Sequence, residues 1–78
     1  MPLYATRGEL DIALDLLRVE MPDLVAEFTN DAEFWFAFSA HSDLIIDDAS
    51  PDDLPYVRQQ LNEMLADHGK PPLRESPS

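Results

Sequence analysis

Along the first third of the chain, apolar residues recur every three or four positions, a spacing that places side chains on one face of an α-helix. This stripe consists of Leu10, Ala13, Leu14, Leu17 and Met21. Three further apolar residues, Ile12, Leu16 and Val19, widen it beyond a single face. We therefore expect the first helix to be buried on more than one side.

Local signals predict where this helix begins and ends. Thr6 and Glu9 have the spacing of a capping box, in which each side chain accepts a hydrogen bond from the other residue's backbone amide. Pro22 lacks an amide hydrogen and disfavours the α conformation at Met21. The sequence therefore predicts a first helix that ends near Glu20 and a second, short helix that starts at Pro22.

The middle of the chain contains an apolar segment that fits either of two structures. Asn30 can cap a helix, with Glu33 at the third helical position. Residues 34–38 are apolar on every side, which is typical of a buried strand or a buried helix. The preceding cap and the alanine and serine residues that follow favour the helix. Residues 42–48 either continue this helix or form a separate turn.

The last third has the clearest helical pattern. Its apolar stripe consists of Leu54, Val57, Leu61, Met64 and Leu65. Asp52 or Asp53 can cap this helix, with Pro55 among the first residues, whose amides have no helical partner. Gly69 followed by Pro71 is a stop signal. Residues 71–78 have little left to bury, so we expect a flexible tail there.

These elements predict an all-α fold: a single helical domain over residues 1–70, with three to four short helices in a small bundle and a disordered C-terminal tail over 71–78. A chain of 78 residues suits one domain. Without cysteine it gains no disulfide, and its stability should be about 3–5 kcal/mol. The N-terminus lacks the apolar region of a signal peptide, and no apolar run approaches the ~20 residues that span a bilayer. We expect a soluble, cytoplasmic protein.

Charge is distributed unevenly along the chain, which carries a formal net charge of -11 at pH 7. Between Arg18 and Arg58 there is no lysine or arginine. The same stretch contains ten carboxylates: Glu20, Asp23, Glu27, Asp31, Glu33, Asp43, Asp47, Asp48, Asp52 and Asp53. A field of one sign repels nucleic acid and anionic lipid and attracts basic surfaces. We therefore expect a basic protein partner and neither nucleic acid nor membrane.

No residue pattern indicates a catalytic, cofactor or metal site, so we expect a protein that is not an enzyme. The acidic stretch that starts at Asp43 has the length of a calcium loop, which needs oxygen ligands at positions 3 and 12 and glycine at position 6. Those positions hold Ile45, Leu54 and Asp48. Ser42-Asp43-Leu44 resembles the Asp-Ser-Leu motif of acyl carrier proteins with its first two residues reversed. We interpret Ser42 as a local cap and expect no prosthetic group.

Residues 42–70 resemble the second half of the immunity proteins that inhibit DNase-type colicins. The matching features are Ser42-Asp43-Leu44-Ile45, an acidic loop with Ser50-Pro51, an amphipathic helix and then Gly69-Lys70. The resemblance implies a small acidic four-helix protein that binds a basic nuclease and blocks its access to substrate. In that family two tyrosines after the Asp-Leu-Ile segment anchor the complex, but this chain has Ile46 and Asp47 there. Only Asp43, as an acidic contact, is carried over.

We therefore predict a small acidic binding protein, either an inhibitor or immunity factor or a nucleic-acid mimic, that engages a basic protein partner. The predicted contact residues are Asp43, Asp47, Asp48, Asp52, Asp53, Trp35 and Phe36. The two aromatics are included because exposed aromatics beside acids are typical of interfaces. The alternative is a homodimeric structural or accessory protein that pairs the surfaces of Trp35 and Phe36, with its acidity serving solubility.

Overall fold

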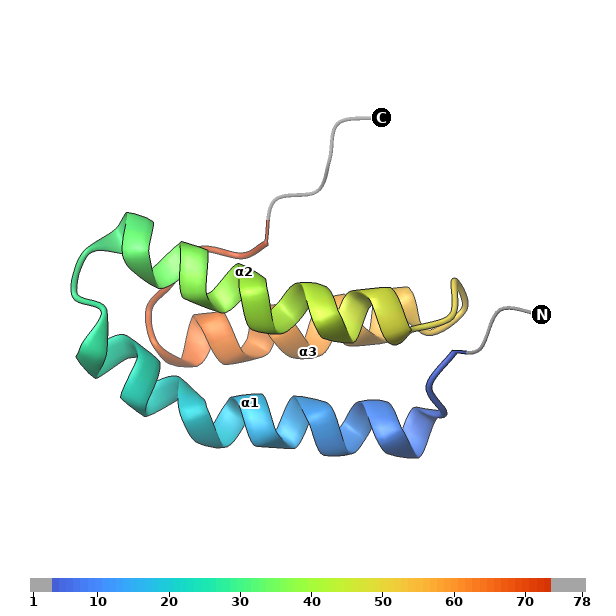
Figure 1. Ribbon diagram of the computed structural model, residues 1–78. Coiled ribbons are helices and arrows are strands. Elements are labelled where there is room, and N and C mark those ends of the chain that lie inside the picture. Colours follow the sequence, from blue (N-terminus) through green and yellow to red (C-terminus); the bar gives the residue numbers. More distant parts are fainter. Residues whose placement is uncertain (1–3, 74–78) are drawn as a thin grey trace.

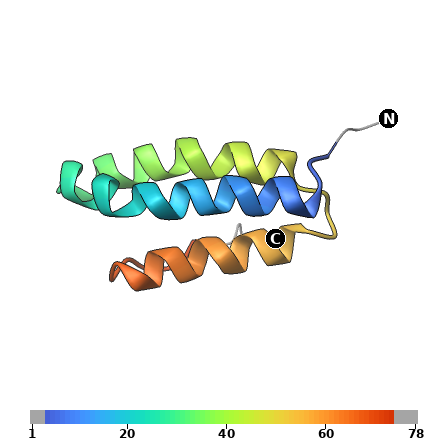
Figure 2. The same ribbon diagram turned by 90° about the horizontal axis from the view of Figure 1, so that it is seen from below.

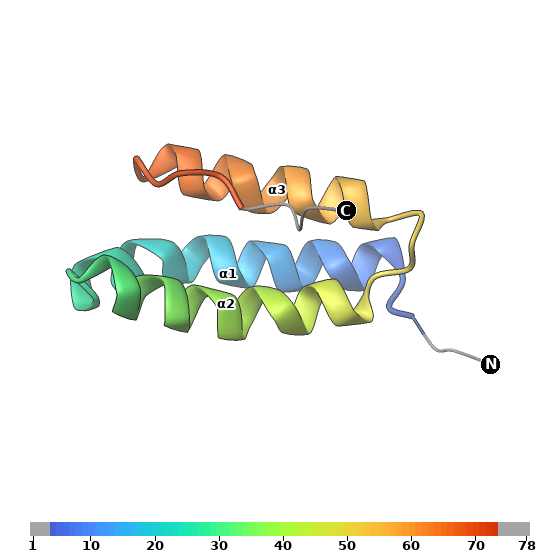
Figure 3. The ribbon, with the colours of Figure 1, turned by 90° about the horizontal axis from the view of Figure 1, so that it is seen from above.

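Three α-helices make up the part of the chain that the computed structural model describes, residues 4–73. They are α1 (Arg7–Glu27), α2 (Asp31–Asp48) and α3 (Leu54–Asp67), and no strand occurs within that range. Helices α1 and α2 run antiparallel with α3 behind them, as Figure 1 shows. The views from below and above place α3 on one side of the α1–α2 pair (Figures 2 and 3). The predicted all-α bundle is confirmed.

Helix α1 begins at the predicted capping box. The Glu9 amide donates to Thr6 Oγ1 at 3.1 Å, and the Thr6 amide donates to Glu9 Oε1 at 3.0 Å. The backbone amide of Thr6 lowers the pKa of the Glu9 carboxyl below its ordinary value, because it stabilises the charged form. The start of the first helix was therefore predictable to the residue.

The predicted end of the first helix is wrong. Helix α1 continues through Pro22 to Glu27, so the separate short helix does not exist. Met21 and Leu24, on either side of the proline, are both buried in the core. Burying each such side chain contributes about 1.5–3 kcal/mol, which offsets the ~3 kcal/mol cost of proline inside a helix. Pro22 itself is exposed, and the helix bends beyond it (Figure 1).

The expectation that α1 is buried on more than one side is also wrong. Ile12, Leu16 and Val19 are 65%, 62% and 75% exposed. Helices α2 and α3 pack against one side of α1, which buries Leu10, Leu14 and Leu17 and leaves the opposite side open.

Helix α2 settles the two open questions about the middle of the chain. The Asn30 side chain accepts from the amides of Ala32 and Glu33 at 2.8 and 3.4 Å, which confirms the predicted cap. Residues 34–38 are helical, and residues 42–48 continue the same helix. Phe34 and Phe38 are fully buried, with ring centroids 5.8 Å apart. Ser42 is buried inside the helix, where its hydroxyl donates to the Ser39 carbonyl, so its interpretation as a cap is wrong.

Helix α3 completes the core through the predicted stripe. Val57, Leu61, Met64 and Leu65 are buried, and Leu54 is half-buried. The helix ends before Gly69, whose φ of 70° is the left-handed conformation that glycine favours.

The chain beyond α3 packs back onto the bundle. Leu73 is half-buried against the core, and its amide donates to Asn62 Oδ1 at 2.8 Å. The expected flexible tail thus begins with a packed segment, and its residues 74–78 lie outside the described residues. None of the helices described combines the length and the apolar character needed to cross a membrane.

Candidate protein interface

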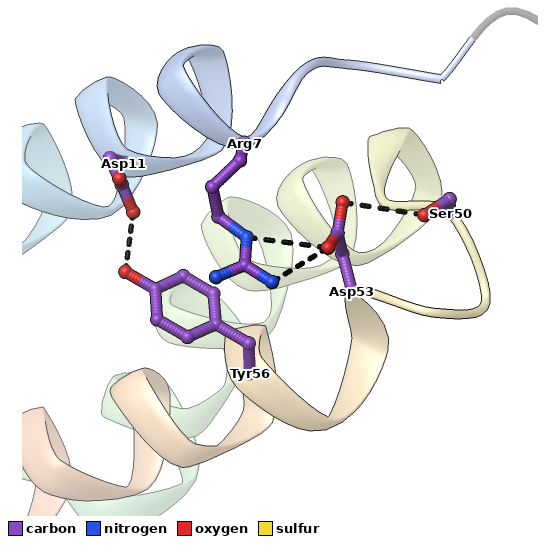
Figure 4. A network of polar contacts seen from close by, with 5 residues as sticks. All are labelled: Arg7, Asp11, Ser50, Asp53 and Tyr56. Atoms are coloured by element: carbon purple, nitrogen blue, oxygen red, sulfur yellow. Dashed lines mark hydrogen bonds and ion pairs between the residues drawn. The ribbon is translucent and has the colours of Figure 1, made fainter.

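A polar network joins the start of α1 to the start of α3 (Figure 4). Arg7 donates to Asp53 Oδ1 through Nη2 at 2.8 Å, and its guanidinium carbon lies 4.0 Å from the centroid of the Tyr56 ring. Ser50 Oγ donates to the other oxygen of Asp53, and the Tyr56 hydroxyl donates to Asp11. The hydrogen bond to Asp53 raises the pKa of Arg7, and the bond to Asp11 raises the pKa of Tyr56. The charge of Arg7 is therefore already paired with a carboxylate of the same chain.

The other cations of the described chain also lie at α3. Arg18 of α1 donates to Gln60 of α3 at 2.9 Å. Lys70 lies three residues after the end of α3, and its ammonium lies 4.6 Å from the centroid of the Phe34 ring. Arg58 is part of α3 itself. Across residues 4–73, every lysine and arginine thus lies on α3, just after it or in contact with it.

The carboxylates have a different distribution. Of the ten between Arg18 and Arg58, nine are exposed and Asp53 is half-buried. Among these ten carboxylates, only Asp31 and Asp53 lie within 4 Å of a lysine or arginine nitrogen of the described chain. Most of the negative charge is therefore uncompensated and faces solvent.

The five predicted contact acids lie in the second half of α2 and in the connection to α3. Asp43 and Asp47 are exposed on α2, Asp48 ends that helix, and Asp52 lies in the connection to α3. Asp53 instead pairs with Arg7. Four of the five remain available to a partner, and one already has a partner inside the molecule.

A groove runs between α1 and α2, and no residue of α3 lines it. Figure 1 shows these two helices in front of α3. The groove consists of two hollows of about 520 and 430 Å³ that share His41. Phe28, Phe36 and Ala40 line the first, near the α1–α2 connection. Leu16 and Leu44 line the second.

Large apolar side chains stand exposed along this groove. Phe36 is 82% exposed and Leu44 is 68% exposed, and both belong to α2. From α1 comes Leu16, which is 62% exposed and lines the same hollow as Leu44. Ile12 and Val19 are also exposed on α1 but line neither hollow. A contiguous apolar surface with a polar rim is typical of a protein-interaction site.

The charged side chains that line the same groove are almost all acidic. They are Glu9, Glu20, Glu33 and Asp48. The one basic side chain is His41, whose Nδ1 lies 3.9 Å from Glu20 Oε2, and no described lysine or arginine lines the groove. We call these four carboxylates together with Phe36, Leu16 and Leu44 the α1/α2 face.

The predicted aromatic pair is divided between two surfaces. Phe36 belongs to the α1/α2 face. Trp35 is half-buried and packs edge-on against Phe34 and Phe38, with centroid distances of 5.6 and 5.8 Å. It also lines a hollow of about 570 Å³ between α2 and α3, to which Leu73 contributes.

Sequence reasoning predicts Phe36 but misses the other apolar residues of the α1/α2 face. The pattern groups Leu16 with the buried side of the first helix and does not mark Leu44 as a contact. The available signal was the excess of apolar positions around α1, because a helix packed against two neighbours can bury only part of its circumference.

The described residues and the known proteins add no further assignment. Within residues 4–73, no group of three or more His, Asp or Glu side chains is placed to hold a metal ion. No protein-family model matches the chain, and no curated protein or solved structure is significantly similar to it. The α1/α2 face is therefore the basis for the functional inference.

Proposed function

We propose that this chain is a small, non-catalytic binding protein that engages a basic protein partner through the α1/α2 face. The observation that supports the proposal is the separation of charge across the bundle. Four carboxylates line the apolar groove, whereas the described lysines and arginines lie at α3. A partner that approaches the groove therefore meets negative charge that no neighbouring lysine or arginine cancels.

The proposed mechanism has two steps. The negative field first steers a basic surface toward the groove, which raises the association rate. Apolar anchors such as Phe36, Leu16 and Leu44 then exclude water and hold the complex together. The same field repels nucleic acid and anionic membranes, which leaves protein as the partner class.

The biological role that follows is that of an inhibitor in the cytoplasm, which acts by occupying a basic cleft of its partner. A basic cleft on a protein is commonly the place where that protein binds an anionic substrate such as nucleic acid. An acidic protein that docks there blocks the substrate. Asp43, Asp47 and Asp52 are also exposed, on and just after α2, and Asp43 lines the α2–α3 hollow together with Arg58.

The alternative function is a homodimer that buries the same apolar residues, and the exposure of Phe36 and Leu44 favours it. Pairing two copies through this face would bring the carboxylates of both copies together, in a chain of net charge -11. Like charges across an interface are destabilising. Charge complementarity therefore favours a basic partner over a second copy.

The proposal is tested with two variants of equal net charge. Glu20→Gln/Asp48→Asn removes two charges from the α1/α2 face, and the control Glu63→Gln/Asp67→Asn removes two exposed charges from α3. Each protein is immobilised and loaded with extract from the cells that produce it. Retained proteins are identified by mass spectrometry, and the association rate of the purified partner is measured at rising salt.

The proposal predicts a retained basic protein whose association rate falls steeply with salt, because exposed charges are screened over about 8–10 Å. The face variant should associate several-fold more slowly than the α3 control. Equal rates for the two variants, or a partner that is not basic, would contradict the proposal.

A further inference from the structure

Resting on the proposed function, we infer that the α1/α2 face receives an amphipathic basic helix of the partner, which lies along the groove as the fourth helix of a bundle. This inference specifies the shape of the partner as well as its charge. It is supported by the spacing of the apolar anchors, by the small residues in the groove and by the positions of the acids.

The residues that line the groove repeat at helical intervals on both walls. On α2 they are Phe36, Ala40 and Leu44, which are four residues apart and span about 12 Å at 1.5 Å per residue. On α1, Ala13, Leu16 and Glu20 line the groove at intervals of three and four residues, a span of about 10.5 Å. A partner helix that presents anchors at i, i+4 and i+7 covers the same distance.

Small side chains allow a helix to approach closely. Ala13 on α1, and Ala37 and Ala40 on α2, all line the groove. The axes of packed helices lie about 8–10 Å apart, depending on the side chains at the contact, and small residues favour the closer approach. Larger residues lie around these alanines, with Leu16 and Leu44 in one hollow and Phe28 and Phe36 in the other. This alternation suits apolar side chains of a docked helix, which would enter the two hollows.

The acids set the length and polarity of the proposed helix. Glu33 and Asp48 lie near opposite ends of α2, fifteen residues and therefore about 22 Å apart. Glu20, on α1, lies between them beside His41. A partner helix of about four turns, with lysine or arginine flanking its apolar stripe, can reach all three carboxylates.

The other modes of peptide recognition fit less well. Addition of a strand needs an exposed sheet edge, and residues 4–73 form no strand. A second copy would place carboxylates against carboxylates. The groove between two antiparallel helices matches the surface that a third neighbouring helix occupies in four-helix bundles.

The test does not assume that the ligand is helical, because the peptides are selected from random sequences. A display library of random 18-residue peptides is selected for binding to the full chain and counter-selected against Leu16→Ser/Leu44→Ser. Both leucines are more than 60% exposed, so this variant should fold, which circular dichroism checks. Phe36→Ser provides a second, independent variant of the face.

The inference predicts enriched peptides with apolar residues at i, i+3 or i+4 and i+7, separated by lysine or arginine. A chosen peptide should gain helicity on binding and shift the amide resonances of α1 and α2. It should bind each serine variant at least tenfold more weakly.

Other outcomes separate the inference from the proposed function. Basic peptides without helical periodicity would overturn the helical partner and leave the proposed function standing. Peptides without excess basic residues would contradict the proposed function itself. A dimer in sedimentation experiments that Leu16→Ser/Leu44→Ser dissociates would identify a second copy as the occupant and overturn both. Failure to enrich any peptide over the counter-selecting variant would overturn the inference.

Discussion

A matched pair of leucine substitutions separates the core from the α1/α2 face. Leu61 is fully buried in α3, whereas Leu44 is 68% exposed in α2, and both lie inside a helix. Leu61→Ala removes a buried side chain and leaves a cavity, at a cost of about 2–5 kcal/mol. Leu44→Ala removes little buried area, and alanine is the better helix former, so the change should stay within about 0.5 kcal/mol.

The assay is urea unfolding monitored by circular dichroism at several protein concentrations. With about 3–5 kcal/mol expected for a domain of this size, Leu61→Ala should be partly or largely unfolded without denaturant. Leu44→Ala should unfold at the same urea concentration as the original protein. A loss of stability in Leu44→Ala equal to that in Leu61→Ala would refute the separation of face from core. A loss that also depends on protein concentration would indicate that a second copy covers Leu44.

Three further predictions concern the helix signals. Pro22→Ala should stabilise the protein by about 1–3 kcal/mol in urea unfolding, because proline inside a helix costs ~3 kcal/mol and the bend recovers part of it; a destabilised variant would mean that the bend itself is required for packing. Asn30→Ala should cost about 0.5–2 kcal/mol in the same assay through loss of the α2 cap, and no change would show that this cap contributes nothing. Carboxyl-detected NMR titration should find the pKa of Glu9 below that of a free glutamate, because the Thr6 amide stabilises its charged form. Since the folded-state pKa is lowered, the stabilisation by Glu9 is present above its unfolded pKa and is lost as pH falls through the folded one. Glu9→Gln should remove this acid-sensitive contribution to the stability of the fold. A Glu9 pKa equal to that of a free glutamate would contradict the reasoning.

Capping and stop signals, which depend only on neighbouring residues, predicted the helix ends correctly at Thr6, Asn30 and Gly69. Thr6 and Asn30 cap helices as predicted, because a side chain can satisfy a free amide wherever the helix later packs. Gly69 adopts the left-handed conformation for an equally local reason. The all-α fold could be predicted from such signals together with the apolar stripes of α1 and α3.

Features decided by tertiary packing could not be predicted in the same way. Pro22 was interpreted as a break, but the burial of Met21 and Leu24 keeps the helix intact. Leu14 and Leu16 look alike in sequence, yet one is in the core and the other faces solvent, because the neighbouring helices contact only one side of α1.

The candidate site was predictable in charge and not in position. The excess of carboxylates is visible in the sequence, as is the absence of cations between Arg18 and Arg58. The position depends on which helices share a groove, and that placed Glu20 and Asp48 beside Leu44. Asp53 could not be distinguished from the other acids, because its partner Arg7 lies 46 residues away in sequence.

Site-specific photocrosslinking in the cells that produce the protein tests the α1/α2 face most directly. A photoreactive phenylalanine derivative is placed at Leu44 on the face and, in a control protein, at the exposed Gln59 on α3. We predict that the Leu44 position forms an adduct with a basic protein, attached at a helix that carries lysine or arginine beside its apolar stripe, and that the Gln59 position does not. Equal crosslinking from both positions, or an adduct only with a second copy of this chain, would contradict the assignment of the α1/α2 face to a basic partner.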